Sequence, residues 1–138
     1  MRIKIKKLHP DAVLPKYAKQ GDAGMDLTAV SREYIDSNHF KYNFGLAIEI
    51  PEGFVGFIFP RSSCYKQWQI MSNCVGVVDS GYRGEVSAVM IGTTDNSYHV
   101  GDRVAQLIVM PIPYVQFDEV DELSDTERGS GGYGSTGK

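Results

Sequence analysis

Short apolar runs separated by turn sequences are the feature that most restricts the fold of this 138-residue chain. Residues 2–6 alternate between polar and apolar side chains, which is typical of a half-buried strand. Pro51-Glu52-Gly53 is a tight-turn sequence with an apolar run on each side. No segment carries a long apolar stripe at helical spacing, and only residues 64–68 suit a short helical turn. Together with 15 glycines, the pattern predicts an all-β sandwich or barrel. The expected strands are 2–6, 44–50, 54–59, 75–78, 86–91, 98–100 and 104–109.

The composition excludes several classes of protein. An apolar content of 42% and a charged content of 22% are ordinary for one soluble globular domain. A net charge of −3 provides no electrostatic footprint for nucleic acid, so a polyanionic ligand would need locally placed cations. No apolar run approaches the roughly 20 residues that cross a bilayer, and no signal peptide is evident. Cys64 and Cys74 match no metal spacing and are expected as thiols in a reducing cytosol. We therefore expect a cytoplasmic protein with neither nucleic-acid nor membrane partners.

Residues 76–85 contain the clearest candidate for chemistry. An apolar run ends at Asp79, Ser80 and Gly81 are turn formers, and Tyr82 precedes a second apolar run. We expect a hairpin whose head holds Asp79 and Tyr82 facing the same space. A fixed carboxylate beside an aromatic ring suits a site that activates water next to a flat ligand. Aspartate is also common in ordinary turns, because its side chain caps backbone N–H groups.

The C-terminal part changes in composition. Residues 118–127 contain six acidic residues and no basic ones, and residues 128–138 are almost all small. A glycine-rich segment buries too little apolar area to offset its ordering entropy. We therefore expect a folded domain over 1–127 and a mobile arm over 128–138. The arm matches a dinucleotide-binding pattern and most of a Walker A loop, but both motifs need a preceding strand and a following helix.

Four short motifs accompany the Asp79 segment, and in chain order the five resemble those of the trimeric dUTP pyrophosphatases (dUTPases). The resemblance extends from about Gly21 to the C-terminus. It implies a distorted jelly-roll or β-barrel-like subunit with a flexible glycine-rich C-terminal arm. It also implies a Mg²⁺-dependent homotrimer, with active sites at subunit interfaces, that hydrolyses dUTP to dUMP and pyrophosphate by water attack at the α-phosphorus. The four motifs are AGMDL at 23–27, PRSS at 60–63, GDRVAQ at 101–106 and RGSGGYGSTG at 128–137.

The resemblance assigns the nucleoside-binding and catalytic roles. Asp79 corresponds to the carboxylate that orients and deprotonates the attacking water. Tyr82 corresponds to the aromatic ring that packs under the deoxyribose and leaves no room for a 2′-hydroxyl. Asn73 corresponds to the asparagine that helps to read the uracil edge, and the backbone around Val77 and Val78 would supply further hydrogen bonds. Fixed polar groups discriminate strongly, because a wrong base leaves them unpaired.

Phosphate contacts are expected from two motifs of the β domain. Arg61, Ser62 and Ser63 follow Pro60 at a strand end, where donors can be aimed at phosphate oxygens. Arg61 suits a structural ion pair equally well. Gln106 corresponds to the glutamine of the fourth motif, which lies near the phosphates.

The arm is expected to close over the active site. Arg128 would contact the terminal phosphate, and Tyr133 would stack over the uracil, where the family more commonly has phenylalanine. Gly134, Ser135 and Thr136 would offer backbone N–H and hydroxyl donors to the triphosphate.

Asp26 is the metal candidate. It would hold Mg²⁺ through water, since Mg²⁺ keeps several waters and is bound mainly by substrate phosphates. Its alternative role is that of a turn residue fixing the loop after Gly24.

Two other functions remain open. A dCTP deaminase-like enzyme shares the fold and a similar turn, but needs a glutamate where this chain has Val89, which cannot transfer protons. A non-catalytic nucleotide-sensing protein on the same fold is the second alternative, and the absence of pyrophosphate release from dUTP would support it.

Overall fold

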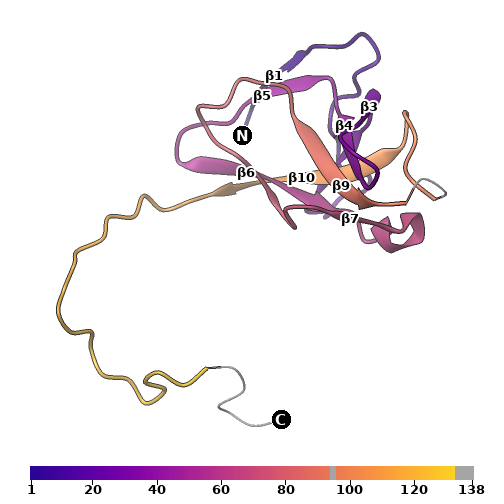
Figure 1. Ribbon diagram of the computed structural model, residues 1–138. Coiled ribbons are helices and arrows are strands. Elements are labelled where there is room, and N and C mark those ends of the chain that lie inside the picture. The colour runs from indigo at the N-terminus through magenta and orange to yellow at the C-terminus, as the bar shows by residue number, and fades with distance from the viewer. Residues whose placement is uncertain (94–95, 133–138) are drawn as a thin grey trace.

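The computed structural model describes residues 1–93 and 96–132 (Figure 1). Within this part the regular structure is short strands and one 3₁₀ turn, so the expected all-β class is confirmed. The helical turn expected at 64–68 is also present, as η1. None of the helical structure in the described part is long and apolar enough to cross a membrane. The elements are β1 (Lys4–Lys7), β2 (Met25–Thr28), β3 (Ser31–Tyr34), β4 (His39–Asn43), β5 (Leu46–Glu49), β6 (Phe54–Pro60), η1 (Cys64–Gln67), β7 (Gln69–Met71), β8 (Gly76–Val78), β9 (Ser87–Gly92) and β10 (Arg103–Pro111).

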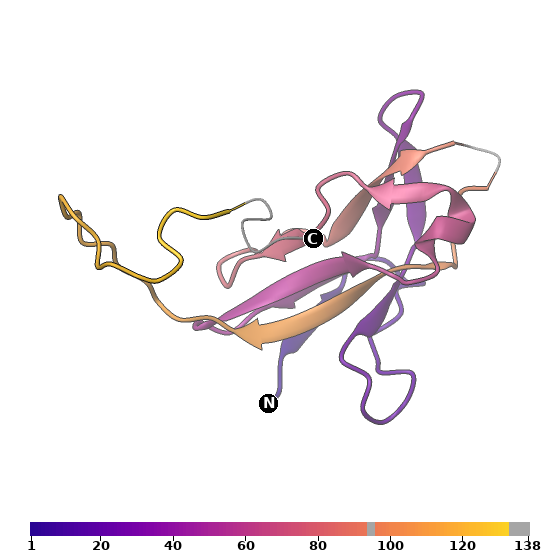
Figure 2. The ribbon, with the colours of Figure 1, turned by 90° about the horizontal axis from the view of Figure 1, so that it is seen from below.

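The strands form two four-stranded sheets and one two-stranded sheet. Their orders are β2-β10-β6-β8, β3-β4-β9-β7 and β1-β5, and the pairings are antiparallel. Figure 2 shows β6 and β10 side by side in one layer, with β7 and β9 in another. Phe40, Tyr42 and Met90 of one sheet and Leu27 and Leu107 of the other are buried in the core.

The strand predictions are confirmed for several segments and wrong for one. The expected strand at 98–100 is instead a turn before β10, closed by a hydrogen bond from the Asp102 N–H to the His99 carbonyl at 3.1 Å. Prediction from the sequence missed β2, β3, β4 and β7. These strands are short and carry mixed polar and apolar residues, so their partners across the sheet stabilise them more than their own pattern indicates.

The expected hairpin at Asp79 is also wrong. β8 pairs with β6, whereas β9 pairs with β4 and β7, so the segment between β8 and β9 passes from one sheet to the other. Buried Val86 anchors this corner, since its N–H donates to the Leu46 carbonyl at 2.8 Å and its carbonyl accepts from the Phe44 N–H at 3.1 Å. These bonds satisfy the backbone groups of Val86 beside the end of β4 and the start of β5, rather than in a ladder between β8 and β9.

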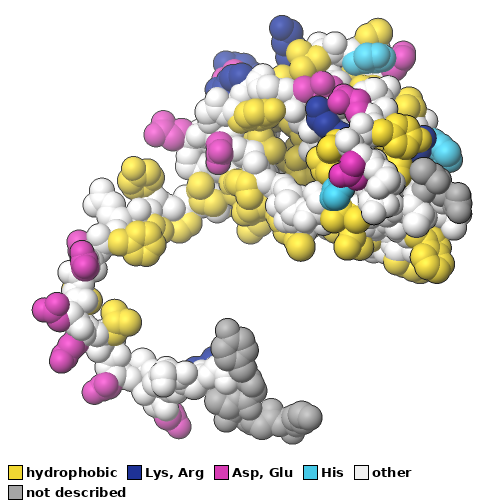
Figure 3. All heavy atoms as spheres, in the orientation of Figure 1, with side chains coloured by type: hydrophobic (Ala, Val, Ile, Leu, Met, Phe, Trp, Pro, Cys, Tyr) yellow, Lys and Arg dark blue, Asp and Glu magenta, His cyan; other side chains and the backbone are white. Residues whose placement is uncertain are grey.

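Beyond β10 the chain extends away from the body (Figures 1 and 3). The Ile112 N–H donates to the Gly53 carbonyl at 2.9 Å, and the chain then carries exposed apolar side chains, with Tyr114 95% and Phe117 94% exposed. The extended segment thus begins before the expected boundary at residue 128, and the division into domain and arm stays a prediction. Of the arm, residues 133–138 lie outside the described residues.

Candidate functional site

A polar cavity of about 420 Å³ lies between the end of β6, β2 and β10. Sheet register assembles it, since Gln106 on β10 pairs with Asp26 on β2 and with Phe59 on β6, and Arg61 follows β6 directly. The structure thus brings together expected site residues from three separate motifs. We call this space the phosphate-side cavity; its lining includes Asp22, Gly24, Asp26, Arg61, Ser62, Arg103 and Gln106.

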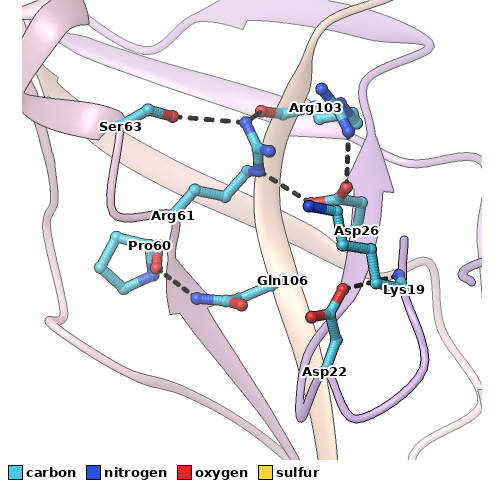
Figure 4. Close-up of polar contacts among 8 residues, drawn as sticks. All are labelled: Lys19, Asp22, Asp26, Pro60, Arg61, Ser63, Arg103 and Gln106. Atoms are coloured by element: carbon cyan, nitrogen blue, oxygen red, sulfur yellow. Dashed lines mark hydrogen bonds and ion pairs between the residues drawn. The ribbon is translucent and has the colours of Figure 1, made fainter. Parts of the chain in front are cut away.

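Asp26 is held between two arginines (Figure 4). Arg61 Nε donates to Asp26 Oδ1 at 2.8 Å, and Arg103 Nη1 donates to Oδ2 at 3.0 Å. The Asp26 side chain is 20% exposed and that of Arg61 25%, so this ion pair is partly shielded from water. The charge-assisted bond at Oδ1 holds the guanidinium of Arg61, and the one at Oδ2 holds that of Arg103. The structural ion pair expected as one role of Arg61 is therefore present, whereas its contact to phosphate stays a prediction. The alternative role of Asp26 as a turn residue is wrong, because Asp26 lies within β2.

Gln106 is positioned by its neighbours on both sides. Its Nε2 donates to the Pro60 carbonyl at 3.0 Å. A Cβ at Gly24 would lie 2.2 Å from Gln106 Oε1, so only glycine lets the amide approach this closely. The contact between Gly24 and Gln106 could not be predicted from the sequence, where its one signal is a glycine two residues before Asp26.

The charges of the phosphate-side cavity nearly cancel. Arg61 and Arg103 oppose Asp22 and Asp26 in its lining. A polyanion in this cavity would therefore meet no net positive charge from these four residues. The described residues contain no group of three or more His, Cys, Asp or Glu side chains able to hold a metal ion. Since arginines occupy both oxygens of Asp26, these residues do not fit a metal bound directly by protein carboxylates; the water-mediated role of Asp26 stays a prediction.

A second cavity, of about 190 Å³, lies beside β8. We call it the Asp79 cavity. Asp79 and Tyr82 both line it, so the prediction that they face the same space is confirmed although the hairpin is not. The other expected nucleoside-binding residues, Asn73, Val77 and Val78, also line it.

Tyr82 is held at this cavity by local contacts. Its N–H donates to the Asp79 carbonyl at 3.1 Å, and its hydroxyl donates to the Glu85 carbonyl at 3.0 Å. A Cβ at Gly84 would lie 2.6 Å from Cζ of the ring, so the ring lies directly against the Gly84 backbone. Tyr82 is still 45% exposed, which leaves ring surface available for a ligand. The role of Gly84 could not be predicted from the sequence.

The two cavities have no lining residue in common. Val78, just before Asp79, pairs with Gly56 near the start of β6, whereas Arg61 follows its end. At about 3.3 Å per residue, Asp79 and Arg61 are roughly 15–20 Å apart along the sheet. One copy of the chain therefore does not place Asp79 beside the phosphate-side cavity.

Comparison with known proteins identifies a family. The family model described as dUTPase matches residues 11–137. A protein of Thermobifida fusca (strain YX) named deoxyuridine 5'-triphosphate nucleotidohydrolase is 42% identical over 142 residues, covering 99% of this chain and 79% of the relative. A protein of the same name from Gloeothece citriformis (strain PCC 7424) is 43% identical over 141 residues, covering 99% and 97%.

Solved structures have the same fold. The dUTPase of Staphylococcus bacteriophage 80alpha with dUpNHpp superposes with a TM-score of 0.86 at 25% identity, covering 99% of each chain. A dUTPase variant from phage phi11 of S. aureus, described as revealing the coordination of a structural Mg(II) ion, has a TM-score of 0.73 at 22% identity, covering 88% of this chain and 98% of that one.

Proposed function

The chain belongs to the dUTPase family, and we propose on that premise that it hydrolyses dUTP to dUMP and pyrophosphate by water attack at the α-phosphorus. The observation that carries this proposal is the Asp79 cavity, where a carboxylate and an aromatic ring share one space with Asn73. Its lining suits a nucleoside held next to a water-activating group.

In the proposed reaction Asp79 accepts the proton of the attacking water. The hydrogen bond between the Tyr82 N–H and the Asp79 carbonyl keeps this turn in one conformation. The ring of Tyr82 packs under the deoxyribose, and Asn73 with the backbone of Val77 and Val78 reads the uracil edge. The Tyr82 ring already lies against the Gly84 backbone and cannot move away from the sugar in that direction. A ribose would therefore find no space for its 2′-hydroxyl next to the ring.

On the phosphate side, Arg61, Ser62, Ser63 and Gln106 donate to phosphate oxygens. Asp26 supports this arrangement, since it holds Arg61 by an ion pair that is already formed. Donors fixed before the substrate binds cost no reorganisation when charge develops on the pyrophosphate.

Assembly into a homotrimer would bring the two halves of the site together. The roughly 15–20 Å between Asp79 and Arg61 supports active sites shared between copies, with the phosphate-side cavity of one facing the Asp79 cavity of another. The apolar side chains of Tyr114, Phe117 and Leu123, all at least 88% exposed, support contact of the extended segment with a neighbouring copy. If these side chains stayed exposed to water, the unfavourable free energy of hydrating their apolar surface would remain.

The remaining positive charge would come from Mg²⁺ and the arm. The two arginines and two aspartates that line the phosphate-side cavity cancel in charge, so they do not neutralise the phosphates. Mg²⁺ bound to the triphosphate would offset this negative charge. From residues 128–138, Arg128 contacts the terminal phosphate, Tyr133 stacks over the uracil, and Gly134, Ser135 and Thr136 surround the triphosphate.

Pyrophosphate release from dUTP, dCTP, dTTP and UTP, measured side by side with Mg²⁺ present, tests this function. Rapid release from dUTP alone, with dUMP as the other product, is expected. Release of ammonia from dCTP would favour a deaminase, although Val89 on β9 provides no carboxylate for it. Binding of dUTP without pyrophosphate release would favour a nucleotide sensor.

Replacing Gly84 with alanine should weaken selection of the sugar. The added Cβ would lie 2.4 Å from the Tyr82 hydroxyl and 2.6 Å from Cζ, so the ring must move toward the ligand or rotate away. We expect kcat/KM for dUTP to fall about tenfold and the preference for dUTP over UTP to narrow, since a misplaced group costs binding energy. Gly81→Ala is the matched control, because a Cβ at Gly81 meets nothing within 4 Å. An unchanged dUTP-to-UTP ratio in Gly84→Ala would contradict this role of the ring.

Replacing Asp26 with asparagine distinguishes two roles of this residue, which are to hold Arg61 in place and to contact the hydrated metal ion. Asparagine removes the negative charge and leaves one acceptor oxygen where Arg61 and Arg103 now bond to two, so Arg61 should be held less firmly and KM for dUTP should rise about tenfold. The Mg²⁺ concentration for half-maximal rate should stay within about twofold if phosphates hold the metal. Asp22→Asn is the control, because Asp22 lines the same cavity but, among the described residues, its carboxylate accepts from the backbone N–H of Lys19 and from neither arginine. A large shift in the Mg²⁺ requirement with unchanged KM would instead place Asp26 in the shell of the metal.

A further inference from the structure

Glu85 lies shortly after Tyr82 in the segment between β8 and β9, and its side chain reaches a distant part of the chain. Its Oε1 accepts a hydrogen bond from the Gly45 N–H at 2.8 Å. Gly45 is buried in the bend between β4 and β5 and belongs to neither strand. A buried N–H needs a partner, and the carboxylate of Glu85 provides it for this bend.

Gly45 is a firm attachment point for this carboxylate. Its φ of 64° lies in the left-handed region that favours glycine. A Cβ at this position would lie 2.8 Å from the Cβ of His9 and 3.1 Å from that of Ala12, so the bend is closely packed. The Gly45 carbonyl accepts from the Leu8 N–H at 2.7 Å. These contacts fix the place of the Gly45 N–H and therefore of the carboxylate bonded to it.

The peptide group between Glu85 and Val86 connects this attachment to Tyr82. Its N–H donates to the Leu46 carbonyl at 2.8 Å, and its carbonyl accepts from the Tyr82 hydroxyl at 3.0 Å. A trans peptide group is planar, so its N–H and C=O point in opposite directions. The group therefore bridges β5 on one side and the Tyr82 ring on the other, and its orientation decides where the hydroxyl finds its acceptor.

The two ends of this peptide group are held by different kinds of bond. On the Val86 side, the next carbonyl accepts from the Phe44 N–H at 3.1 Å, a backbone bond that does not depend on a side chain. On the Glu85 side, the bond from the Gly45 N–H goes to the side chain. A residue without an acceptor at this distance from the backbone would lose it. The side chain of Glu85 thus contributes to the placement of its own carbonyl.

We propose that Glu85 is a positioning residue for sugar selection, whose carboxylate, bonded to Gly45, fixes the carbonyl that receives the Tyr82 hydroxyl. Tyr82 is 45% exposed, so packing by neighbouring side chains does not by itself enclose its ring. The Gly84 backbone supports one part of the ring, and the Glu85 carbonyl holds its hydroxyl end. This inference rests on the proposed function, because it assigns Glu85 to the sugar-binding part of that site.

Steady-state hydrolysis of dUTP and UTP by the full-length protein tests the inference. In Glu85→Ala the ratio of kcat/KM for dUTP to that for UTP should narrow about three- to tenfold, the range expected from one lost hydrogen bond. Glu85→Gln should keep this ratio within about twofold of the wild type, because its amide oxygen can still accept from Gly45. Glu49→Ala is the matched control, since its carboxylate also accepts a hydrogen bond, from Lys4, but lies outside both cavities.

A double-mutant cycle with Tyr82→Phe shows whether Glu85 acts through the hydroxyl. Phenylalanine keeps the ring but cannot donate to the Glu85 carbonyl. Tyr82→Phe alone should narrow the dUTP-to-UTP ratio about as much as Glu85→Ala does. Adding Glu85→Ala to Tyr82→Phe should then have almost no further effect, because the two changes break the same connection. If Glu85→Ala does not fold, Glu85→Asp takes its place in the cycle, because its carboxylate is one methylene too short to keep the bond to Gly45.

The sugar preference separates positioning from a structural role. The melting temperature of Glu85→Ala should fall, since the buried Gly45 N–H loses its partner. Lower stability alone would leave the dUTP-to-UTP ratio of the folded enzyme unchanged. An unchanged ratio in folded Glu85→Ala or Glu85→Asp would overturn the inference, and so would equal effects of the substitution in the wild-type and Tyr82→Phe backgrounds. A wild-type protein that does not hydrolyse dUTP would overturn the proposed function as well, whereas failure of the coupling alone leaves that function intact.

Discussion

Replacing Asp79 with asparagine is expected to lower the turnover of dUTP by about 10²–10⁴-fold, the usual contribution of a general base. Asparagine keeps the shape of the side chain but cannot accept a proton from water. The turn around it should persist, because the hydrogen bond between the Tyr82 N–H and the residue 79 carbonyl involves only the backbone. Steady-state release of pyrophosphate measures the loss.

Binding provides the necessary second measurement for this variant. The α,β-imido analogue of dUTP should bind Asp79→Asn within about tenfold of the wild-type affinity, since the uracil, sugar and phosphate contacts do not involve the carboxylate. Asp11→Asn, at an exposed position outside both cavities, should leave turnover unchanged. Turnover of Asp79→Asn within tenfold of the wild type would remove Asp79 from the role of base.

Removing residues 128–138 is expected to abolish most of the activity while leaving the fold intact. The truncated chain retains every strand and the apolar core, so its melting temperature should change by only a few degrees. Catalysis should fall by orders of magnitude, because a closing segment excludes water and completes the site. The truncated chain also lacks Arg128 and Tyr133, which are the proposed contacts to the terminal phosphate and the uracil.

A second truncation, after Pro111, is the matched comparison. It also removes the exposed apolar side chains of Tyr114, Phe117 and Leu123, which the shorter truncation keeps. Light scattering should therefore report a trimer for the chain that ends at Glu127 and loss of the trimer for the chain that ends at Pro111. Full activity of the chain ending at Glu127 would show that residues 128–138 take no part in catalysis.

The properties that were predictable from the sequence are those set by near neighbours in the chain. Asp79 and Tyr82 share a cavity because a turn of a few residues joins them. The turn-forming residues Ser80 and Gly81 predicted that turn. The turn at residues 51–53 is confirmed in the same way, with a hydrogen bond from the Phe54 N–H to the Pro51 carbonyl and a positive φ at Gly53. The all-β class followed from the period of the apolar runs, which is a local property as well.

Other features depended on contacts between segments far apart in the chain. The clamp of Asp26 by Arg61 and Arg103 exists because β2 and β6 both flank β10, an arrangement that no local pattern specifies. Pairing between strands decided that Asp79 lies at a corner between sheets and at the opposite end of β6 from Arg61. The sequence by itself thus determined the fold class, the motifs and the local turns, because steric preferences and hydrophobic periodicity act over a few residues. Only the tertiary structure decided which motifs share a cavity, because register and packing join residues that chain order keeps apart.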